Sequence, residues 1–104
     1  MKICREGETI NVTDVKELGL ANSDLFGSEV LAALDVGVRN IVIDLSVTDV
    51  VDCSGLGALV GLYKAARRRG EEISVQIVNP TRLARQVMSL TKLDDFFLSG
   101  RPAF

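Results

Sequence analysis

The 104-residue chain has no histidine and no tryptophan, and only two cysteines and two prolines. Without histidine there is no imidazole base to activate a serine or cysteine nucleophile, and no HExxH zinc motif. Cys4 and Cys53 are far apart in the sequence, so neither a CxxC redox motif nor a four-thiolate zinc site can be written. Most enzyme chemistries are therefore disfavoured, and we expect no metal, no cofactor and two reduced thiols.

Long hydrophobic runs and large charge excesses are also missing. The net charge is -2, and the longest apolar stretches fall well short of the roughly 20 residues that span a bilayer. The N-terminal MKICREGE is too polar for a signal peptide. The only basic run, Arg67 to Arg69, is short, poor in aromatic neighbours and typical of the last turn of a helix. We expect a cytoplasmic protein without membrane insertion and without direct nucleic-acid binding.

What the chain does have is 47% hydrophobic residues, enough for one core without disulfides. We expect a single domain over residues 1–104. Over residues 1–37, the hydrophobic periods predict a strand over Lys2–Arg5, a turn at Glu6–Glu8 and a strand over Thr9–Leu18. A loop over Gly19–Ser23 follows. We then expect a helix that Ser23 or Asp24 caps and that runs up to Gly37, with Phe26, Val30, Ala33 and Leu34 on its buried face.

The second part begins with a β-branched apolar run, Asn40–Leu45, which predicts a central strand covered on both faces. The pattern then predicts a loop over Ser46–Cys53. A helix follows that starts at Ser54 and ends before Gly70, with Leu56, Leu59, Val60 and Tyr63 on one face. After a strand over Ile73–Val78, we expect a helix that Asn79 caps and Pro80 opens and that buries Leu83, Val87 and Leu90, and then a last strand over Asp94–Ser99.

Helices that connect short buried strands imply crossover connections between parallel neighbours. The sequence therefore predicts an α/β fold: a small mixed β-sheet with an N-terminal hairpin and central parallel strands, with the helices packed against it.

The segment most informative about function is VVDCSGLG, residues 50–57. A serine at a helix N-terminus, here Ser54, is usually only a cap. Gly55 and Gly57 would let another backbone approach closely, and Asp52 adds local charge. A phosphoryl group on Ser54 would lie over the helix amides and add a charge of about -1.5 to -2. The helix would tolerate this group, whereas a partner docked on the same surface would be repelled.

At these residues the chain resembles the STAS family, the domain shared by bacterial anti-sigma factor antagonists and sulfate transporters. The resemblance covers most of the chain, and it rests on Ile41–Ser46, Val51–Leu59, Val75–Pro80, Leu83–Thr91 and Leu93–Phe97. It implies a STAS-type fold. In the antagonist branch, the serine immediately before the GLG segment is phosphorylated by the anti-sigma factor, and this serine corresponds to Ser54. Cys53 replaces a common Ser or Thr, so only Ser54 can be phosphorylated in the motif.

The resemblance also implies partners and a binding surface. The unphosphorylated chain would bind an anti-sigma factor serine kinase of the GHKL type, phosphorylation would release it, and a PP2C-type phosphatase would restore binding. The chain would then be a substrate and binding module, not an enzyme. A weak homodimer is a further expectation. The residues expected at the partner surface are Asp52, Cys53, Gly55, Leu56, Gly57, Ser23, Asn79 and Thr81.

Other readings stay open beside this one. Asp44, Asp49 or Asp52 could accept a phosphoryl group in a receiver-like domain, but the paired acidic residues and the lysine of such a site are missing. A nucleotide-binding module would need GxxxxGK[ST] or GxGxxG, which are also missing. The serious alternative is a STAS domain of an anion transporter, of a stressosome-like scaffold or of a lipid-transport regulator.

Overall fold

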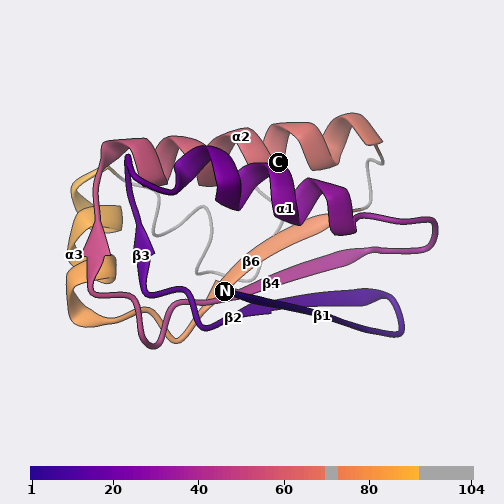
Figure 1. The fold of residues 1–104 in the computed structure, drawn as a ribbon, viewed down its shortest axis with the longest axis horizontal. Coiled ribbons are helices and arrows are strands. Elements are labelled where there is room, and N and C mark those ends of the chain that lie inside the picture. The colour runs from indigo at the N-terminus through magenta and orange to yellow at the C-terminus, as the bar shows by residue number, and fades with distance from the viewer. Residues whose placement is uncertain (70–72, 92–104) are drawn as a thin grey trace.

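The computed structural model of the chain describes residues 1–69 and 73–91. These form a four-stranded sheet of order β1-β2-β4-β6, a two-stranded ribbon of β3 and β5, and three helices (Figure 1). The elements are β1 Lys2–Glu6, β2 Thr9–Thr13, β3 Glu17–Leu18, α1 Ser23–Ala33, β4 Asn40–Asp44, β5 Val50–Val51, α2 Cys53–Arg69, β6 Ser74–Val78 and α3 Arg82–Leu90. The predicted helix end at Gly70 and the predicted strand Asp94–Ser99 lie outside the described residues.

The predicted N-terminal hairpin is confirmed. β1 and β2 pair antiparallel, with Lys2 opposite Thr13 and Glu6 opposite Thr9. The two-residue turn between them starts with Gly7 at φ +60, a value that glycine adopts without steric cost.

The single predicted strand over residues 9–18 is wrong. The chain leaves the sheet after Thr13, and Asp14 has φ +59, a left-handed conformation that Asp tolerates better than most residues. Beyond this break, Glu17 and Leu18 form β3, which pairs in parallel with β5 and not with the main sheet. β5 in turn lies inside the segment predicted as a loop.

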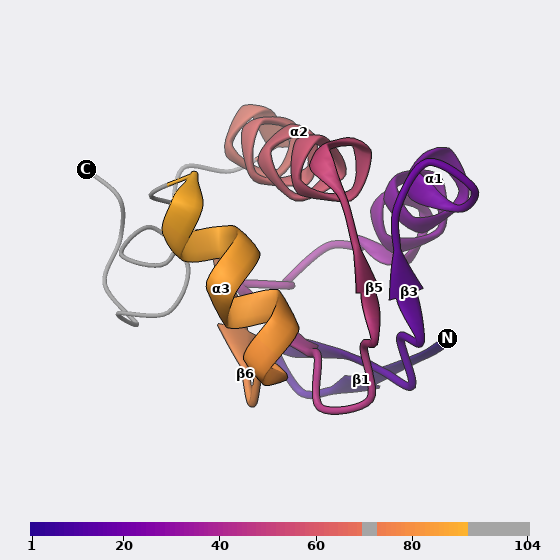
Figure 2. The same cartoon turned by 90° about the vertical axis from the view of Figure 1, so that its left-hand side faces the viewer.

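β4 is the central strand, as predicted. It is parallel to β2 on one side and to β6 on the other. Ile41 and Ile43 are fully buried on the face that α1 and α2 cover (Figures 1 and 2). Val42, which alternates to the opposite face, is only half-buried. The predicted coverage of both faces is therefore wrong, and the strand shows the alternating burial of a sheet with one packed face.

Each helix buries a face that differs in part from the predicted one. α1 buries Phe26 and Val30 as predicted but ends at Ala33, before Gly37. α2 buries Leu56 and Leu59 as predicted, but Val60 and Tyr63 are half-buried. The remaining buried residues of α2 are Gly55, Leu62 and Ala66.

The buried face of α3 was predicted correctly only in part, at Val87, which is half-buried against the core. Leu83 and Leu90 are exposed, and the helix buries Ala84 and Met88. The cap explains the difference, because Thr81 and not Asn79 caps the helix: its side chain accepts a hydrogen bond from the Ala84 amide. Asn79 instead has φ +52, outside the helical region. A small core residue such as Ala84 also gives little hydrophobic signal in a sequence.

Thr48 connects three segments inside the core, and it is the one polar residue that is fully buried in the described part of the chain. Its hydroxyl donates to the carbonyl oxygen of Val15. Its own carbonyl oxygen accepts a hydrogen bond of 2.6 Å from the Thr81 hydroxyl. The connection before β3, the loop before β5 and the cap of α3 are thereby held together.

Within residues 1–69 and 73–91, none of the three helices has both the length and the hydrophobicity that a membrane span requires.

We expect Thr48→Val to lower the free energy of unfolding by about 1–3 kcal/mol, because the Val15 carbonyl then stays buried without its partner. Urea unfolding followed by circular dichroism measures this. Thr13→Val is the matched control, since Thr13 is exposed and should change stability little. Equal effects of the two substitutions would contradict the role assigned to Thr48.

Candidate functional site

The candidate site lies where the β3–β5 ribbon meets the start of α2. β5 ends at Val51 and α2 begins at Cys53, so Asp52 is the residue that precedes the helix. Because β3 and β5 are parallel, the loop over residues 19–22 leaves β3 at the same end. Figure 2 shows this end of the molecule, with the starts of α1 and α2 toward the viewer.

Asp52 caps α2 and holds the neighbouring loop at the same time. Its Oδ1 accepts a hydrogen bond of 3.1 Å from the Gly55 amide, and its Oδ2 accepts one of 3.0 Å from the Leu20 amide. The Leu20 amide is the main cause that lowers the pKa of the Asp52 carboxyl below its ordinary value, and the Gly55 amide adds to this. The carboxylate is therefore ionised at neutral pH.

Ser54 is not the cap of α2. It is the second residue of the helix and is half-buried. Among the described residues, no group forms a hydrogen bond with its hydroxyl. A serine at this position usually caps its helix. Here Asp52 caps α2, so the Ser54 hydroxyl does not serve as the cap.

Gly55 is required by a close backbone contact. A Cβ atom at this position would lie 1.7 Å from the carbonyl oxygen of Leu18, at the end of β3. A Cβ atom at Gly57 would have no atom within 4 Å, and Gly57 is exposed. The two glycines of the motif therefore differ: the first lets α2 start against β3, and the second leaves the helix surface open.

The remaining residues of the motif divide between surface and core. Cys53 is an exposed free thiol at the first position of α2. Leu56 is 4% exposed and belongs to the core, so its side chain is not available for the predicted partner contact.

Ser23 is the first residue of α1 and is half-buried, so it is not the predicted cap. Asn22 takes that position, and its side chain organises the loop instead. Its Nδ2 donates to the Glu17 carbonyl oxygen over 2.7 Å, and its Oδ1 accepts from the Gly19 amide over 2.9 Å. The loop beside Asp52 is thus fixed from both sides.

Asn79 and Thr81 lie at the start of α3, which packs along β5 (Figure 2). Asn79 Nδ2 donates over 3.3 Å to Asp44 Oδ2 at the end of β4, and the Thr81 hydroxyl donates to the Thr48 carbonyl oxygen in the loop before β5. Two hydrogen bonds from Ser46 and a weaker one from Asn79 lower the pKa of the Asp44 carboxyl. No hydrogen bond in the described part of the chain joins either residue to the turn that holds Ser54.

Exposed apolar side chains lie at this end, and those of Leu25 and Val50 are a feature that the sequence analysis missed. Leu20 in the loop is 78% exposed, Leu25 in the first turn of α1 is 59% exposed, and Val50 on β5 is 46% exposed. A leucine in a short polar loop beside a glycine is the one signal in the sequence that could have indicated them. We call Leu20, Leu25 and Val50, together with Cys53, Ser54 and Gly57, the α2-start surface.

Over residues 1–69 and 73–91, no group of three or more His, Cys, Asp or Glu side chains is placed to hold a metal ion.

The chain was compared with protein-family models, curated sequences and solved structures. The model of the STAS domain family matches residues 6–103. The structure is similar to TM1081 of Thermotoga maritima, which has been proposed to be an anti-sigma factor antagonist, with a TM-score of 0.81 and 26% identity over 93% of this chain and 82% of that chain. Among curated protein sequences, none matches.

Two further structures resemble the fold alone, because their sequence identities are low. The unphosphorylated form of SpoIIAA, an anti-sigma factor antagonist, has a TM-score of 0.78 and 17% identity over 93% of this chain and 84% of that chain. The murine anion transporter Slc26a9 has a TM-score of 0.66 and 21% identity, and it is matched by 84% of this chain over 14% of its own length.

We expect Gly55→Ala to lower the free energy of unfolding by about 3 kcal/mol or more, because its Cβ would overlap a backbone oxygen that cannot move away freely. Gly57→Ala is the matched control in the same turn. It should be neutral or stabilising by about 0.5–1 kcal/mol, since alanine favours a helix. Chemical denaturation of both variants measures this, and a tolerated Gly55→Ala would contradict the close contact.

Asp52 should make the stability depend on pH at the acid end. Its pKa in the folded chain lies below the ordinary value of 3.8. Its contribution is therefore complete above that value and is lost as the pH falls through the folded pKa. Unfolding curves at several pH values should show that Asp52→Asn destabilises the chain near neutral pH and less so at low pH. An NMR titration midpoint of this carboxyl at or above 3.8 would contradict the assignment.

Proposed function

The chain belongs to the STAS domain family, and we propose that within this family it acts as an anti-sigma factor antagonist controlled by phosphorylation of Ser54. In this proposal the unphosphorylated chain binds an anti-sigma factor serine kinase of the GHKL type. Phosphorylation of Ser54 by that kinase releases the chain, and a PP2C-type phosphatase makes it competent to bind again. The chain is a substrate and a binding module, and it catalyses no step.

The observation that carries the proposal is the Ser54 hydroxyl. It lies in the first turn of α2, and Asp52 has taken over the capping role that would otherwise occupy it. Phosphorylation of Ser54 therefore breaks no hydrogen bond of the described structure. A modification that costs the fold little can change the surface without unfolding the domain.

The electrostatics of the turn support a change in binding. A phosphoryl group would add a charge of about -1.5 to -2 beside the ionised carboxylate of Asp52. The Asp52 carboxylate already accepts a hydrogen bond from the Gly55 amide, so the Gly55 N–H is not free to donate to the phosphate. The added charge thus stays exposed on the α2-start surface.

The surface itself suits a protein partner that buries it. Leu20, Leu25 and Val50 offer apolar area around the start of α2, and Gly57 leaves the helix accessible to a close approach. An apolar contact of this kind would have to desolvate a phosphate on Ser54 without a cation to pair with it. The same contact can form readily around a neutral hydroxyl.

The proposal is tested by incubating the chain with ATP and the GHKL-type kinase encoded nearest to it. Intact mass and phosphosite mapping should give one phosphate on the wild type and none on Ser54→Ala. Ser89→Ala, which removes an exposed serine of α3, is the control and should gain the phosphate.

Binding is measured in parallel by isothermal titration. We expect Ser54→Ala to bind the kinase like the wild type, and the phosphorylated chain to bind at least about tenfold more weakly, since a buried unpaired charge costs several kcal/mol. Absence of both phosphate and binding would contradict the antagonist role for that kinase. A transporter-associated or scaffold role, which the likeness in fold to Slc26a9 also allows, would then be favoured.

A further inference from the structure

The outer edge of β1 has no neighbouring strand among the residues that the structure describes. β1 stands at the end of the strand order and pairs with β2 on one side only. Its residues are exposed, apart from a half-buried Ile3. Such an edge offers backbone N–H and C=O groups to an added strand.

The hairpin determines which backbone groups point to this open edge. Opposite residues in an antiparallel pair alternate between hydrogen-bonded and non-hydrogen-bonded pairs. Glu6 and Thr9 flank the two-residue turn, and such a pair is hydrogen-bonded. Cys4, two residues back, therefore also directs its backbone groups toward β2. Ile3 and Arg5 direct theirs outward, so an added strand must hydrogen-bond through these two residues.

The edge is complementary to a second copy of itself. In an antiparallel pairing of two β1 strands about a twofold axis at Cys4, Ile3 of each copy lies opposite Arg5 of the other. Both outward-pointing residues are then used, and Lys2 of each copy lies opposite Glu6 of the other. Opposite charges in this position stabilise a strand pair, and the twofold axis provides two such pairs.

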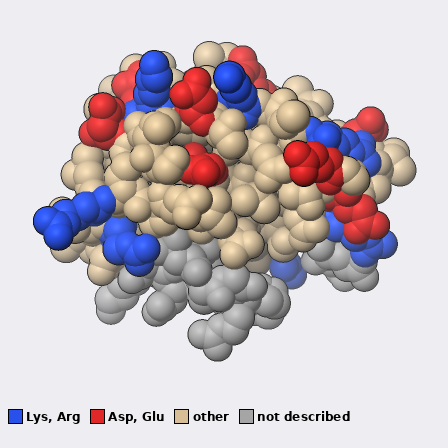
Figure 3. All heavy atoms as spheres, turned by 90° about the horizontal axis from the view of Figure 1, so that it is seen from below, with Lys and Arg blue, Asp and Glu red and all other residues tan. Residues whose placement is uncertain are grey.

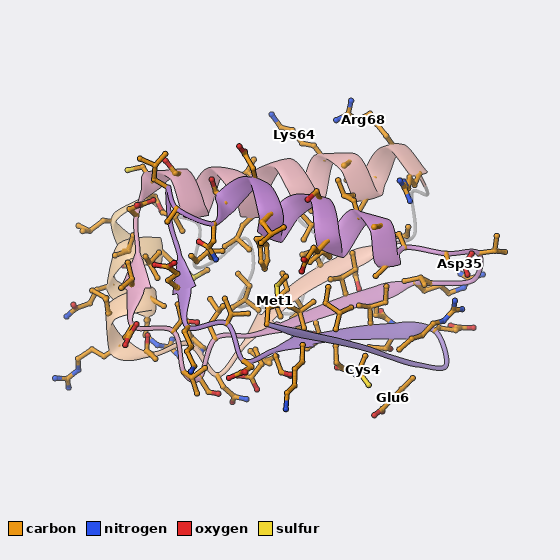
Figure 4. All side chains as sticks on the ribbon, viewed as in Figure 1. Met1, Cys4, Glu6, Asp35, Lys64 and Arg68 are labelled. Atoms are coloured by element: carbon orange, nitrogen blue, oxygen red, sulfur yellow. The ribbon has the colours of Figure 1, made fainter. Side chains whose placement is uncertain are left out.

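The side chains that would meet lie on one face of the strand. Lys2, Cys4 and Glu6 alternate with Ile3, which packs against the core. Figure 4 shows Cys4 and Glu6 pointing from β1 away from the helices. The face of the sheet seen in Figure 3 carries interspersed acidic and basic side chains, with no block of one sign.

Other registers fit less well. An axis at Arg5 would place the two Arg5 side chains opposite each other, and like charges in this position are destabilising. An axis at Ile3 would place Lys2 of each copy opposite Cys4 of the other, so Lys2 and Glu6 would no longer be opposite each other. The axis at Cys4 aligns the whole strand and places Lys2 of each copy opposite Glu6 of the other.

We propose that the chain forms a homodimer through antiparallel pairing of two β1 edges centred on Cys4, which joins the two four-stranded sheets into one. This gives the weak homodimer expected from the sequence a defined surface. The inference does not rest on the proposed function, because no residue of the α2-start surface takes part in it.

Cys4 is a direct probe of the register. Non-hydrogen-bonded opposite residues have Cα atoms about 4.5 Å apart, within the range of about 4.4–6.8 Å that a disulfide spans. Diamide, which accepts the two electrons and two protons of the thiols, should therefore link two Cys4 residues as one disulfide. We expect a covalent dimer from Cys53→Ser, which keeps Cys4, and none from Cys4→Ser.

The charge pattern is tested under reducing conditions by sedimentation equilibrium. Lys2→Glu or Glu6→Lys alone turns both attractive pairs into repulsive ones and should weaken dimerisation about tenfold or more. The double variant Lys2→Glu with Glu6→Lys restores the pairs and should restore the dimer. Lys64→Glu is the matched control, because Lys64 points away from the sheet on α2 (Figure 4), and it should dimerise like the wild type.

Circular dichroism of each variant separates lost association from lost folding. A chain that stays monomeric at every concentration and forms no Cys4 disulfide would overturn the proposal. So would a dimer that links through Cys53 or that ignores the charge of residues 2 and 6.

Discussion

The geometry of this molecule depends on one close contact, between the first turn of α2 and the backbone of β3. Gly55 is the residue that permits it, since any side chain there would occupy the position of the Leu18 carbonyl oxygen. The contact sets where α2 begins, and this places Asp52 in the capping position. Asp52 then reaches the Leu20 amide and fixes the adjoining loop. A glycine at one position thus determines the shape of the whole α2-start surface.

The main sheet was predictable because its signals are local. Residues 41–43 form a β-branched apolar run, and Gly7 marks a two-residue turn between two short strands. The β3–β5 ribbon was not predictable in this way. Its strands have two residues each, too few to show a period, and they pair across a long separation in the sequence. Asp14, which diverts the chain away from the main sheet, looks like any polar residue in a strand.

The place of the candidate site in the sequence was predictable, but the contacts among its residues were not. The spacing of Ser54 and the glycines located the turn, but capping depends on which residue precedes the helix, and a shift of two residues transfers that role from Ser54 to Asp52. The same kind of shift explains α3, where the cap is Thr81 and the buried face turns toward Ala84. The exposure of Leu25 and Val50 was hidden, because burial follows from tertiary packing and not from residue type.

These features give the turn around Ser54 an unusual combination of rigidity and freedom. The backbone is held by the Asp52 cap, by the close contact at Gly55 and by the side chain of Asn22, so the surface has one defined shape. Among the residues that the structure describes, none forms a hydrogen bond with the Ser54 hydroxyl. The proposed switch acts by charge and needs this arrangement, because a surface that changed shape or unfolded on phosphorylation would also lose its proposed partner-binding form. With a fixed backbone around the Ser54 hydroxyl, the added charge alone would distinguish the two proposed states.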